Sequence, residues 1–273
     1  MLRSLVGSEM CIRDSGQSEW NLQKKFTGWV DVDLTPEGKL EACKAGEVIK
    51  STNIKIDLFF SSYQLRAINT LKLIKNTIRN NSEFTKAWEL NERHYGSLTG
   101  LNKDEMKKKL GEKKIHEFRR SWDLRPEPLN KNNPYHPINI DIYKDIPKEN
   151  IPDTESLKDT YNRVVKYFKN KIHHELENEK NILISAHGNS VRALCKFLFK
   201  LDEKQIPMLE IPTGNPLHIE LDKKLDIEKC RYLDQERAQD CLLYTSDSAD
   251  EGLGVDIGGR RIIKKKRGGG GGG

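Results

Sequence analysis

The sequence predicts an α/β fold: a three-layer sandwich in which a mostly parallel central sheet carries helices on both faces. Two observations predict it. Short apolar runs of strand length alternate with longer segments in which apolar residues recur at helical spacing. Polar and cationic residues repeatedly follow the apolar runs, and ligand-binding groups gather at the carboxyl ends of parallel strands.

The first half of the alternation begins with a clear helix start. Thr35-Pro36 is typical of an N-cap followed by proline at the first helical position, and apolar spacing continues this helix to about residue 52. Residues 56–62 form an apolar run that ends in two serines, which indicates a buried strand. A helix is expected over 65–78 and a short strand near 84–88.

The second half contains a long irregular segment between its helices. Residues 102–120, rich in Lys and Glu, predict two helices hinged near Gly111. Residues 125–152, rich in proline and asparagine, indicate a long ordered loop or lid. The remaining elements are expected in this order: a helix over 154–177, a buried strand over 181–186, a helix over 189–199, and strands over 217–221 and 227–233.

The composition is that of a charged globular protein. Of 273 residues, 36% are hydrophobic and 32% charged, with a net charge of +6 that suits a small anionic substrate. No apolar run approaches the roughly 20 residues of a membrane helix, and we recognise no signal peptide. We therefore expect a cytoplasmic protein with neither a membrane nor a nucleic acid as partner.

The cysteines indicate a reducing compartment. Five occur, they are scattered along the chain, and none has the spacing of metal ligands. Free thiols are the simplest interpretation. They are Cys11, Cys43, Cys195, Cys230 and Cys241.

The two ends of the chain do not resemble its middle. Residues 1–15 and 241–273 resemble translated sequencing-adapter or vector sequence, and the second stretch ends in a Lys-Arg run and a run of glycines. We expect residues 241–273 to be an unstructured, non-native tail rather than a nucleic-acid-binding segment. The domain is then expected to span residues 16–240. Residues 8–13 could fill the place of a lost first strand, with a poorer core.

Four segments place polar or cationic groups just after an expected strand or, for the first, after the N-terminal region. They are residues 18–28, 61–66, 91–96 and 186–189. In a parallel sheet these ends meet at one edge, which would gather Arg66, Arg93 and His187 around a single anion. The sequence has no Gly-rich phosphate loop and no acidic cluster spaced for a divalent metal. We therefore expect metal-free phosphoryl transfer through a covalent phosphoenzyme.

Seven sequence blocks carry a resemblance to a known family. They are residues 16–21 (GQSEWN), 26–34 (FTGWVDVDL), 90–96 (LNERHYG), 100–103 (GLNK), 119–120 (RR), 185–190 (SAHGNS) and 211–214 (IPTG). In this order they resemble the 2,3-bisphosphoglycerate-dependent phosphoglycerate mutases of the histidine phosphatase superfamily. The resemblance covers residues 16 to about 240.

The resemblance implies an activity and a role for each site residue. The implied reaction interconverts 2-phosphoglycerate and 3-phosphoglycerate in glycolysis and gluconeogenesis, is primed by 2,3-bisphosphoglycerate as cofactor, and uses no metal. Glu92 is implied as the general acid and base, and His187 as the group that stabilises the transferring phosphoryl group. Phosphate or substrate binding is implied for Ser18, Asn21, Thr27, Gly28, Arg66, Arg93, Tyr95, Lys103, Arg119, Arg120, Gly188 and Asn189.

The central residue of this implied site is missing. The family has Arg-His directly before the glycine that corresponds to Gly16, whereas this chain has Asp14 and Ser15. A phosphoserine ester does not pass its phosphate on readily, and Asp14 adds negative charge where the family has a cation. We expect that the nucleophile was lost where the adapter-like residues 1–15 join the domain. The chain as written is then expected to lack mutase turnover.

Two other functions stay open. A phosphomonoesterase of the same superfamily would fit the scaffold, but its smaller members generally lack segments resembling residues 100–103 and 119–120. A non-catalytic phosphoester-binding protein would fit if the loss of the nucleophile is native. The sequence also leaves a homo-oligomer open.

Overall fold

The computed structural model describes residues 7–209 and 211–234 of the chain. Its centre is one sheet with the strand order β3-β2-β4-β1-β5-β6. The strands are β1 (Ser8–Asp14), β2 (Leu58–Ser61), β3 (Thr85–Lys86), β4 (Ile182–Ala186), β5 (Leu217–Leu221) and β6 (Ile227–Tyr232). The first four pair in parallel, whereas β5 runs antiparallel to both β1 and β6. The predicted mostly parallel sheet is confirmed.

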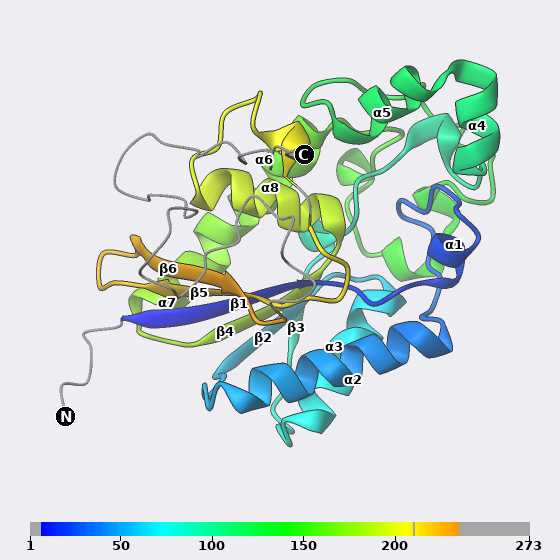
Figure 1. Ribbon diagram of the computed structural model, residues 1–273. Helices are drawn as coiled ribbons and strands as arrows, with labels where there is room; N and C mark the ends of the chain where they lie inside the picture. The colour runs from blue at the N-terminus through cyan, green and yellow to red at the C-terminus, as the bar shows by residue number, and fades with distance from the viewer. Residues whose placement is uncertain (1–6, 210, 235–273) are drawn as a thin grey trace, which may run out of the picture.

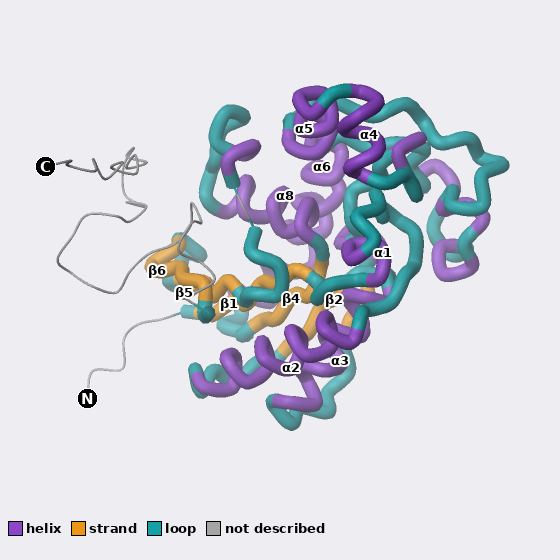
Figure 2. The backbone as a smooth tube through the Cα atoms, turned by 45° about the vertical axis from the view of Figure 1, so that its right-hand side comes forward, coloured by secondary structure: helices purple, strands orange, loops and turns teal. Residues whose placement is uncertain are grey.

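Helices cover both faces of the sheet, as the sequence predicts (Figures 1 and 2). One face carries α2 (Pro36–Ser51) and α3 (Leu65–Thr77). The other carries α6 (Leu157–Tyr167), α7 (His173–Glu177) and α8 (Gly188–Leu198). Three further helices lie beyond the carboxyl ends of the parallel strands: α1 (Glu19–Leu22), α4 (Lys103–Leu110) and α5 (Glu112–Arg120).

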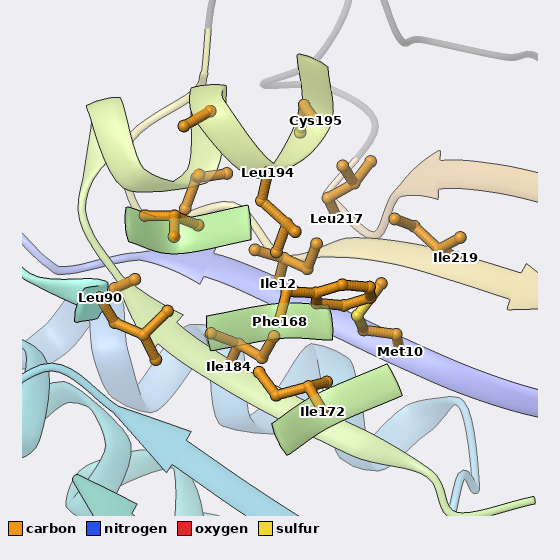
Figure 3. Close-up of a cluster of buried hydrophobic side chains, with 14 of the residues drawn as sticks. Met10, Ile12, Leu90, Phe168, Ile172, Ile184, Leu194, Cys195, Leu217 and Ile219 are labelled. Carbon is orange, nitrogen blue, oxygen red and sulfur yellow. The ribbon is translucent and has the colours of Figure 1, made fainter. Parts of the chain in front are cut away.

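Residues 8–14 form a central strand that contributes to both cores. Successive side chains of a strand point to opposite faces. Met10 and Ile12 therefore share a core cluster with residues of α6 and α8, and Figure 3 shows them with Ile184 and Leu194 of α8. Cys11 points the other way, into the cluster beneath α2 and α3. Met10, Cys11 and Ile12 are each at most 1% exposed.

Local signals fix the helix ends where the sequence predicts them. The Thr35 hydroxyl accepts a hydrogen bond from the Gly38 amide at 3.0 Å, which caps α2 ahead of Pro36. Ser156 and Asp159 form a reciprocal capping box at the start of α6. Gly111, with φ of +87°, separates α4 from α5. The two predicted helices hinged at this glycine are confirmed.

The predicted single helix over 154–177 is wrong in one respect. A π-helical turn, Phe168–Ile172, separates α6 from α7. Phe168, Ile172 and Leu176 all face the core, where each is at most 2% exposed. Simple helical spacing in the sequence does not show such a turn.

The long segment between α5 and α6 is ordered without regular elements, as predicted. It contains three short 3₁₀ turns, the middle one ending at Tyr143. The Tyr143 hydroxyl donates to the Trp29 carbonyl at 2.6 Å, and the two rings are in contact. The His136 ring lies 2.9 Å from the Asp153 carboxylate. The Tyr143 contact joins the segment to the body of the molecule, and the His136 contact holds two parts of the segment together.

Some expectations concern parts of the chain that the structure does not describe. The tail, residues 241–273, and Cys241 lie outside the described residues. The other four cysteines are free thiols, as expected. No helix within residues 7–209 and 211–234 is both long and apolar enough to cross a membrane.

Candidate active site

A polar cavity of about 380 Å³ lies beyond the carboxyl ends of β1 and β4. The four segments expected to converge all reach it, and α4, α5 and the segment before β5 complete its walls. The lining residues are Asp14, Ser15, Asn21, Thr27, Gly28, Arg66, Glu92, Tyr95, Lys103, Arg119, Arg120, His187, Gly188, Asn189, Arg192, Ile211 and Thr213. All predicted site residues except Ser18 and Arg93 are among them.

His187 reaches the cavity because it directly follows β4 and precedes α8 in an extended conformation. Its Nε2 atom lies 2.8 Å from the Ser62 hydroxyl, and the ring is 1% exposed. Burial, together with the positive charges of Arg66 and Arg163, holds the pKa of His187 well below its usual range. The imidazole is therefore neutral at pH 7. The first amides of α8 follow directly and favour an anion at this end of the helix.

Arg66 is fixed in orientation by three acceptors. Its Nη1 donates to the Val30 carbonyl at 3.0 Å, and its Nη2 donates to the Gly28 carbonyl at 2.9 Å and to Gln64 Oε1 at 3.2 Å. Burial lowers the pKa of Arg66, and the charge of Glu92 opposes that shift. A guanidinium remains protonated under all ordinary conditions, so the cavity holds a rigid positive charge here.

Glu92 lies on a backbone segment that is held from several sides. Its amide donates to Gln64 Oε1 at 2.9 Å, and its own carboxylate accepts from the Arg93 amide at 2.7 Å. Arg163, on α6, donates to the carbonyls of Glu89, Asn91 and Glu92 at 2.6–2.9 Å. Arg163 also forms a two-bond ion pair with Glu155, at 2.7 and 2.9 Å. Glu92 is thus a partly exposed carboxylate on a rigid backbone.

The opposite wall is cationic and comes from α4 and α5. Lys103 begins α4, while Arg119 and Arg120 lie in the last turn of α5. Burial lowers the pKa of Lys103. Both arginines are half-buried and line the cavity, so this helix end is not a simple solvated face. Asn189 donates to the Tyr95 hydroxyl at 3.0 Å, which ties the 91–96 segment to α8.

Ser18 and Arg93 are the two predicted residues that do not line the cavity. The Ser18 hydroxyl caps α1 by accepting from the Asn21 amide at 3.3 Å, so its polar atom is used within the chain. Arg93 is fully buried, stacks on the Tyr95 ring and donates to the Phe118 carbonyl. Each side chain points into the protein from a backbone segment that does reach the cavity.

The sequence did not single out Arg192, Ile211 and Thr213. Arg192 lies one helical turn after Asn189 and donates to its side chain at 2.9 Å. It also donates twice to the Leu209 carbonyl, at 3.1 and 3.2 Å. The spacing of three residues on α8 was a usable signal for Arg192. Ile211 and Thr213 belong to a block that carried the family resemblance, but no role was assigned to them.

The sequence matches a known superfamily over most of its length. Residues 15–137 and 131–226 match the Histidine phosphatase superfamily (branch 1). A 2,3-bisphosphoglycerate-dependent phosphoglycerate mutase of Pelagibacter ubique (strain HTCC1062) is 72% identical over 229 residues, covering 84% of this chain and 96% of that protein. A mutase of the same name from Caulobacter sp. (strain K31) is 48% identical, covering 82% and 94%.

This chain belongs to the 2,3-bisphosphoglycerate-dependent phosphoglycerate mutases of the histidine phosphatase superfamily. Solved structures agree on the fold. Mycobacterial hydrolase 1 has a TM-score of 0.61 at 18% identity, covering 82% of this chain and 96% of that one. A mycobacterial glucosyl-3-phosphoglycerate phosphatase has a TM-score of 0.60 at 18% identity, with the same coverage.

Within this mutase fold, Ser15 occupies the position that the family resemblance assigns to the nucleophilic histidine. Asp14 pairs with Ala186, and the Ser15 amide donates to the Ala186 carbonyl at 3.1 Å, so residue 15 lies beside His187 at the strand ends. A Cβ atom added to Gly188 would lie 3.5 Å from Asp14 Oδ2, which places this carboxyl at the start of α8. Burial and the nearby Glu92 raise the pKa of Asp14 to about 7.

Among residues 7–209 and 211–234, no three His, Cys, Asp or Glu side chains are grouped so as to hold a metal ion.

Proposed function

We propose that this chain carries the substrate pocket of a phosphoglycerate mutase, which interconverts 2-phosphoglycerate and 3-phosphoglycerate, and that as written it lacks the nucleophile for turnover. The observation that supports the proposal is the arrangement of the cavity. Cations stand on two opposite walls, and a carboxylate and a neutral imidazole line the space they enclose.

The two cationic walls suit a substrate with two anionic groups. On one side, Arg66, His187 and the first amides of α8 would surround the phosphoryl group, whose charge spreads over its equatorial oxygens. On the other, Lys103, Arg119 and Arg120 would hold the carboxylate or the second phosphate of the ligand. This separation is what distinguishes a phosphoglycerate from a simple phosphomonoester.

Glu92 has the position of a proton carrier between these walls. Its carboxylate lines the cavity, and the held backbone restricts where the oxygens can lie. A general acid and base must be within hydrogen-bond reach of the hydroxyl that gains or loses a proton. We assign that exchange with the glycerate hydroxyl to Glu92.

The residues present fit 2,3-bisphosphoglycerate as a ligand but not as a phosphoryl donor. When bound to a complete enzyme, this group supplies the priming phosphoryl group. Its two phosphates would lie against Arg66 on one wall and against Arg119 and Arg120 on the other. At position 15 a serine hydroxyl replaces the imidazole nitrogen that accepts the phosphoryl group and releases it again. Asp14 would repel the approaching phosphate whenever its carboxyl is ionised.

Calorimetric titration of the unmodified chain tests the pocket. We expect it to bind both sulfate and 3-phosphoglycerate. Lys103→Ala should weaken 3-phosphoglycerate about tenfold or more, the usual scale for one charge-assisted contact, and should change sulfate binding little. The matched control Lys113→Ala removes an exposed lysine of α5 and should leave both affinities unchanged.

Two results would contradict the assignment. Failure of the unmodified chain to bind either anion would show that the pocket is misplaced. Equal loss of sulfate and 3-phosphoglycerate in Lys103→Ala would favour a site for one phosphoryl group only, as in a phosphomonoesterase. A cytoplasmic location and a homo-oligomeric state remain predictions.

A further inference from the structure

Gln64 joins three segments of the cavity wall although it does not line the cavity itself. Its side chain is 0% exposed and lies between β2 and α3. Its Nε2 donates to the Gly28 carbonyl at 2.8 Å. Its Oε1 accepts from Arg66 Nη2 at 3.2 Å and from the Glu92 amide at 2.9 Å. The side-chain amide of Gln64 therefore contacts three groups at once: the phosphate-binding Arg66, the left-handed turn at Gly28 and the backbone of the proton-exchanging Glu92.

Three of these hydrogen bonds form a closed ring. Gln64 donates to the Gly28 carbonyl, Arg66 Nη2 donates to the same carbonyl, and Arg66 Nη2 also donates to Gln64 Oε1. A ring of planar groups fixes the plane of the guanidinium as well as its position. The bonds to Gly28, Gln64 and Val30 use three of the five N–H groups of Arg66. Within the described residues this leaves two N–H groups for an anion.

The same oxygen of Gln64 also fixes the backbone at Glu92. Because Oε1 accepts from both Arg66 and the Glu92 amide, the two groups cannot move apart without breaking one of the bonds. We propose that Gln64 is a positioning residue that sets the separation between the phosphate-binding Arg66 and the proton-exchanging Glu92. This inference rests on the proposed function of the pocket.

The backbone contacts of Gln64 make its side chain a clean target for substitution. Its amide donates to the Ser62 hydroxyl at 3.1 Å, and that hydroxyl contacts His187. A change of side chain leaves this amide in place, so the His187 side of the pocket keeps its support. Replacement of Gln64 by an apolar side chain of similar size would instead leave a partly buried Glu92 amide without its acceptor and Arg66 with one acceptor fewer.

The test compares Gln64→Met with the control Asn181→Leu in the full chain. Asn181 also bridges two backbone segments, at the opposite end of the sheet, where its side chain accepts from Glu9 and donates to Lys55. Sulfate and 3-phosphoglycerate affinities are measured by calorimetry, and hydrogen exchange of the Glu92 amide by NMR. We expect Gln64→Met to lose about tenfold in both affinities and at least tenfold in Glu92 amide protection. Asn181→Leu should lower the melting temperature but leave both affinities and the protection of the Glu92 amide unchanged.

The outcomes separate this inference from the proposed function. If the unmodified chain binds neither anion, the proposed function fails and the inference with it. If the unmodified chain binds and Gln64→Met binds equally well with a protected Glu92 amide, Gln64 is merely structural and the inference is overturned.

A second variant covers the case in which Gln64→Met does not fold. Gln64→Glu keeps an acceptor for the Glu92 amide and for Arg66, cannot donate to the Gly28 carbonyl, and adds a negative charge beside the anion. It should lose at least tenfold in sulfate affinity while protection of the Glu92 amide is retained. Unchanged sulfate affinity, or loss of that protection, would contradict the proposed role.

Discussion

Asp14 places a carboxyl group in a cavity whose other walls are arranged for anions. Its side chain is partly buried, lies at the start of α8, and is faced by Glu92 as well as by the cations Arg13 and Arg66. Burial is the largest cause and Glu92 the next in raising the pKa of Asp14 to about 7, and the two arginines oppose them. The residue therefore changes charge near neutral pH.

This raised pKa makes the stability of the fold depend on pH. The folded state holds the Asp14 proton more tightly than the unfolded chain, where the pKa is about 4. The resulting stability is fully present below about pH 4 and is lost as the pH rises through about 7. The unfolding free energy of Asp14→Asn, relative to that of the unmodified chain, should therefore rise between pH 5 and pH 8 by on the order of 2 kcal/mol.

Urea unfolding at several pH values measures this gain. The control is Glu47→Gln, which removes an exposed carboxylate of α2. Its unfolding free energy should change with pH in the same way as that of the unmodified chain. A constant difference between Asp14→Asn and the unmodified chain across this pH range would show that Asp14 keeps an ordinary pKa.

Motifs in the sequence identified most of the residues that line the cavity, but not the hydrogen bonds that hold those residues in position. Glu92 and His187 could be placed because each lies in a long recognisable block just after a strand. Gln64 could not be placed in this way, because its role depends on bonds to Gly28 and Glu92, which only folding brings close. A motif also does not reveal which way a side chain points, and the Ser18 hydroxyl caps α1 instead of lining the cavity.

At the scale of elements, the pair α4 and α5 positions one entire wall of the cavity. Lys103 and Arg119 lie at opposite ends of this helical pair, so the bend between the helices sets their separation. The bend is Gly111, with φ of +87° and ψ of 146°, near a region of backbone space that is essentially restricted to glycine. Among the described residues, and apart from the chain immediately around Gly111, no heavy atom lies within 4 Å of a Cβ added there.

Gly111→Ala should therefore cost conformational energy without a steric clash. We expect a loss of about 1–3 kcal/mol in unfolding free energy, measured by urea titration. Because the separation of Lys103 and Arg119 depends on this bend, 3-phosphoglycerate affinity should fall as well. Lys113→Ala, two residues along the chain, should cost less than about 0.5 kcal/mol. Equal stability of Gly111→Ala and the unmodified chain would mean that the bend relaxes at no cost.

The elements were predictable where one local signal decided them. Thr35-Pro36 determined the start of α2, and Gly111 determined the break between α4 and α5. The π-helical turn at Phe168–Ile172 left no such signal, because its apolar residues recur every four positions, as they also do in a regular α-helix. The same holds for the parallel or antiparallel direction of β5, which depends on the path of the chain before it.

At the scale of the whole molecule, the two flanks have different relations to the fold. β1 lies between β4 and β5 and contributes Met10, Cys11 and Ile12 to the two cores. At the other end, β6 closes the sheet at Tyr232, and Asp234 is held by Lys44 and Asn215. We propose that the folded unit includes β1, whatever the origin of its sequence, and that residues 241–273 are a non-native tail.

Two truncations test this division of the chain. Removal of residues 241–273 should leave the melting temperature unchanged, because the lysine and glycine runs offer nothing to pack. Removal of residues 1–14 should prevent cooperative folding, because both neighbours of β1 lose a row of hydrogen bonds and a core strand. Calorimetric melting distinguishes the two. A large loss of stability in the first truncation, or a folded product in the second, would contradict the assignment.

We infer that this mutase domain keeps its phosphoglycerate pocket and lacks only the residues that carry the phosphoryl group. Phosphorylation by radiolabelled 2,3-bisphosphoglycerate tests it most directly, with the unmodified chain compared with the double variant Asp14→Arg, Ser15→His. We predict no label and no mutase turnover in the unmodified chain. The double variant should gain an acid-labile, base-stable label together with turnover, and adding Glu92→Gln should slow that turnover about a hundredfold. Mutase turnover in the unmodified chain, or a folded double variant that binds 3-phosphoglycerate yet stays unlabelled, would contradict the account.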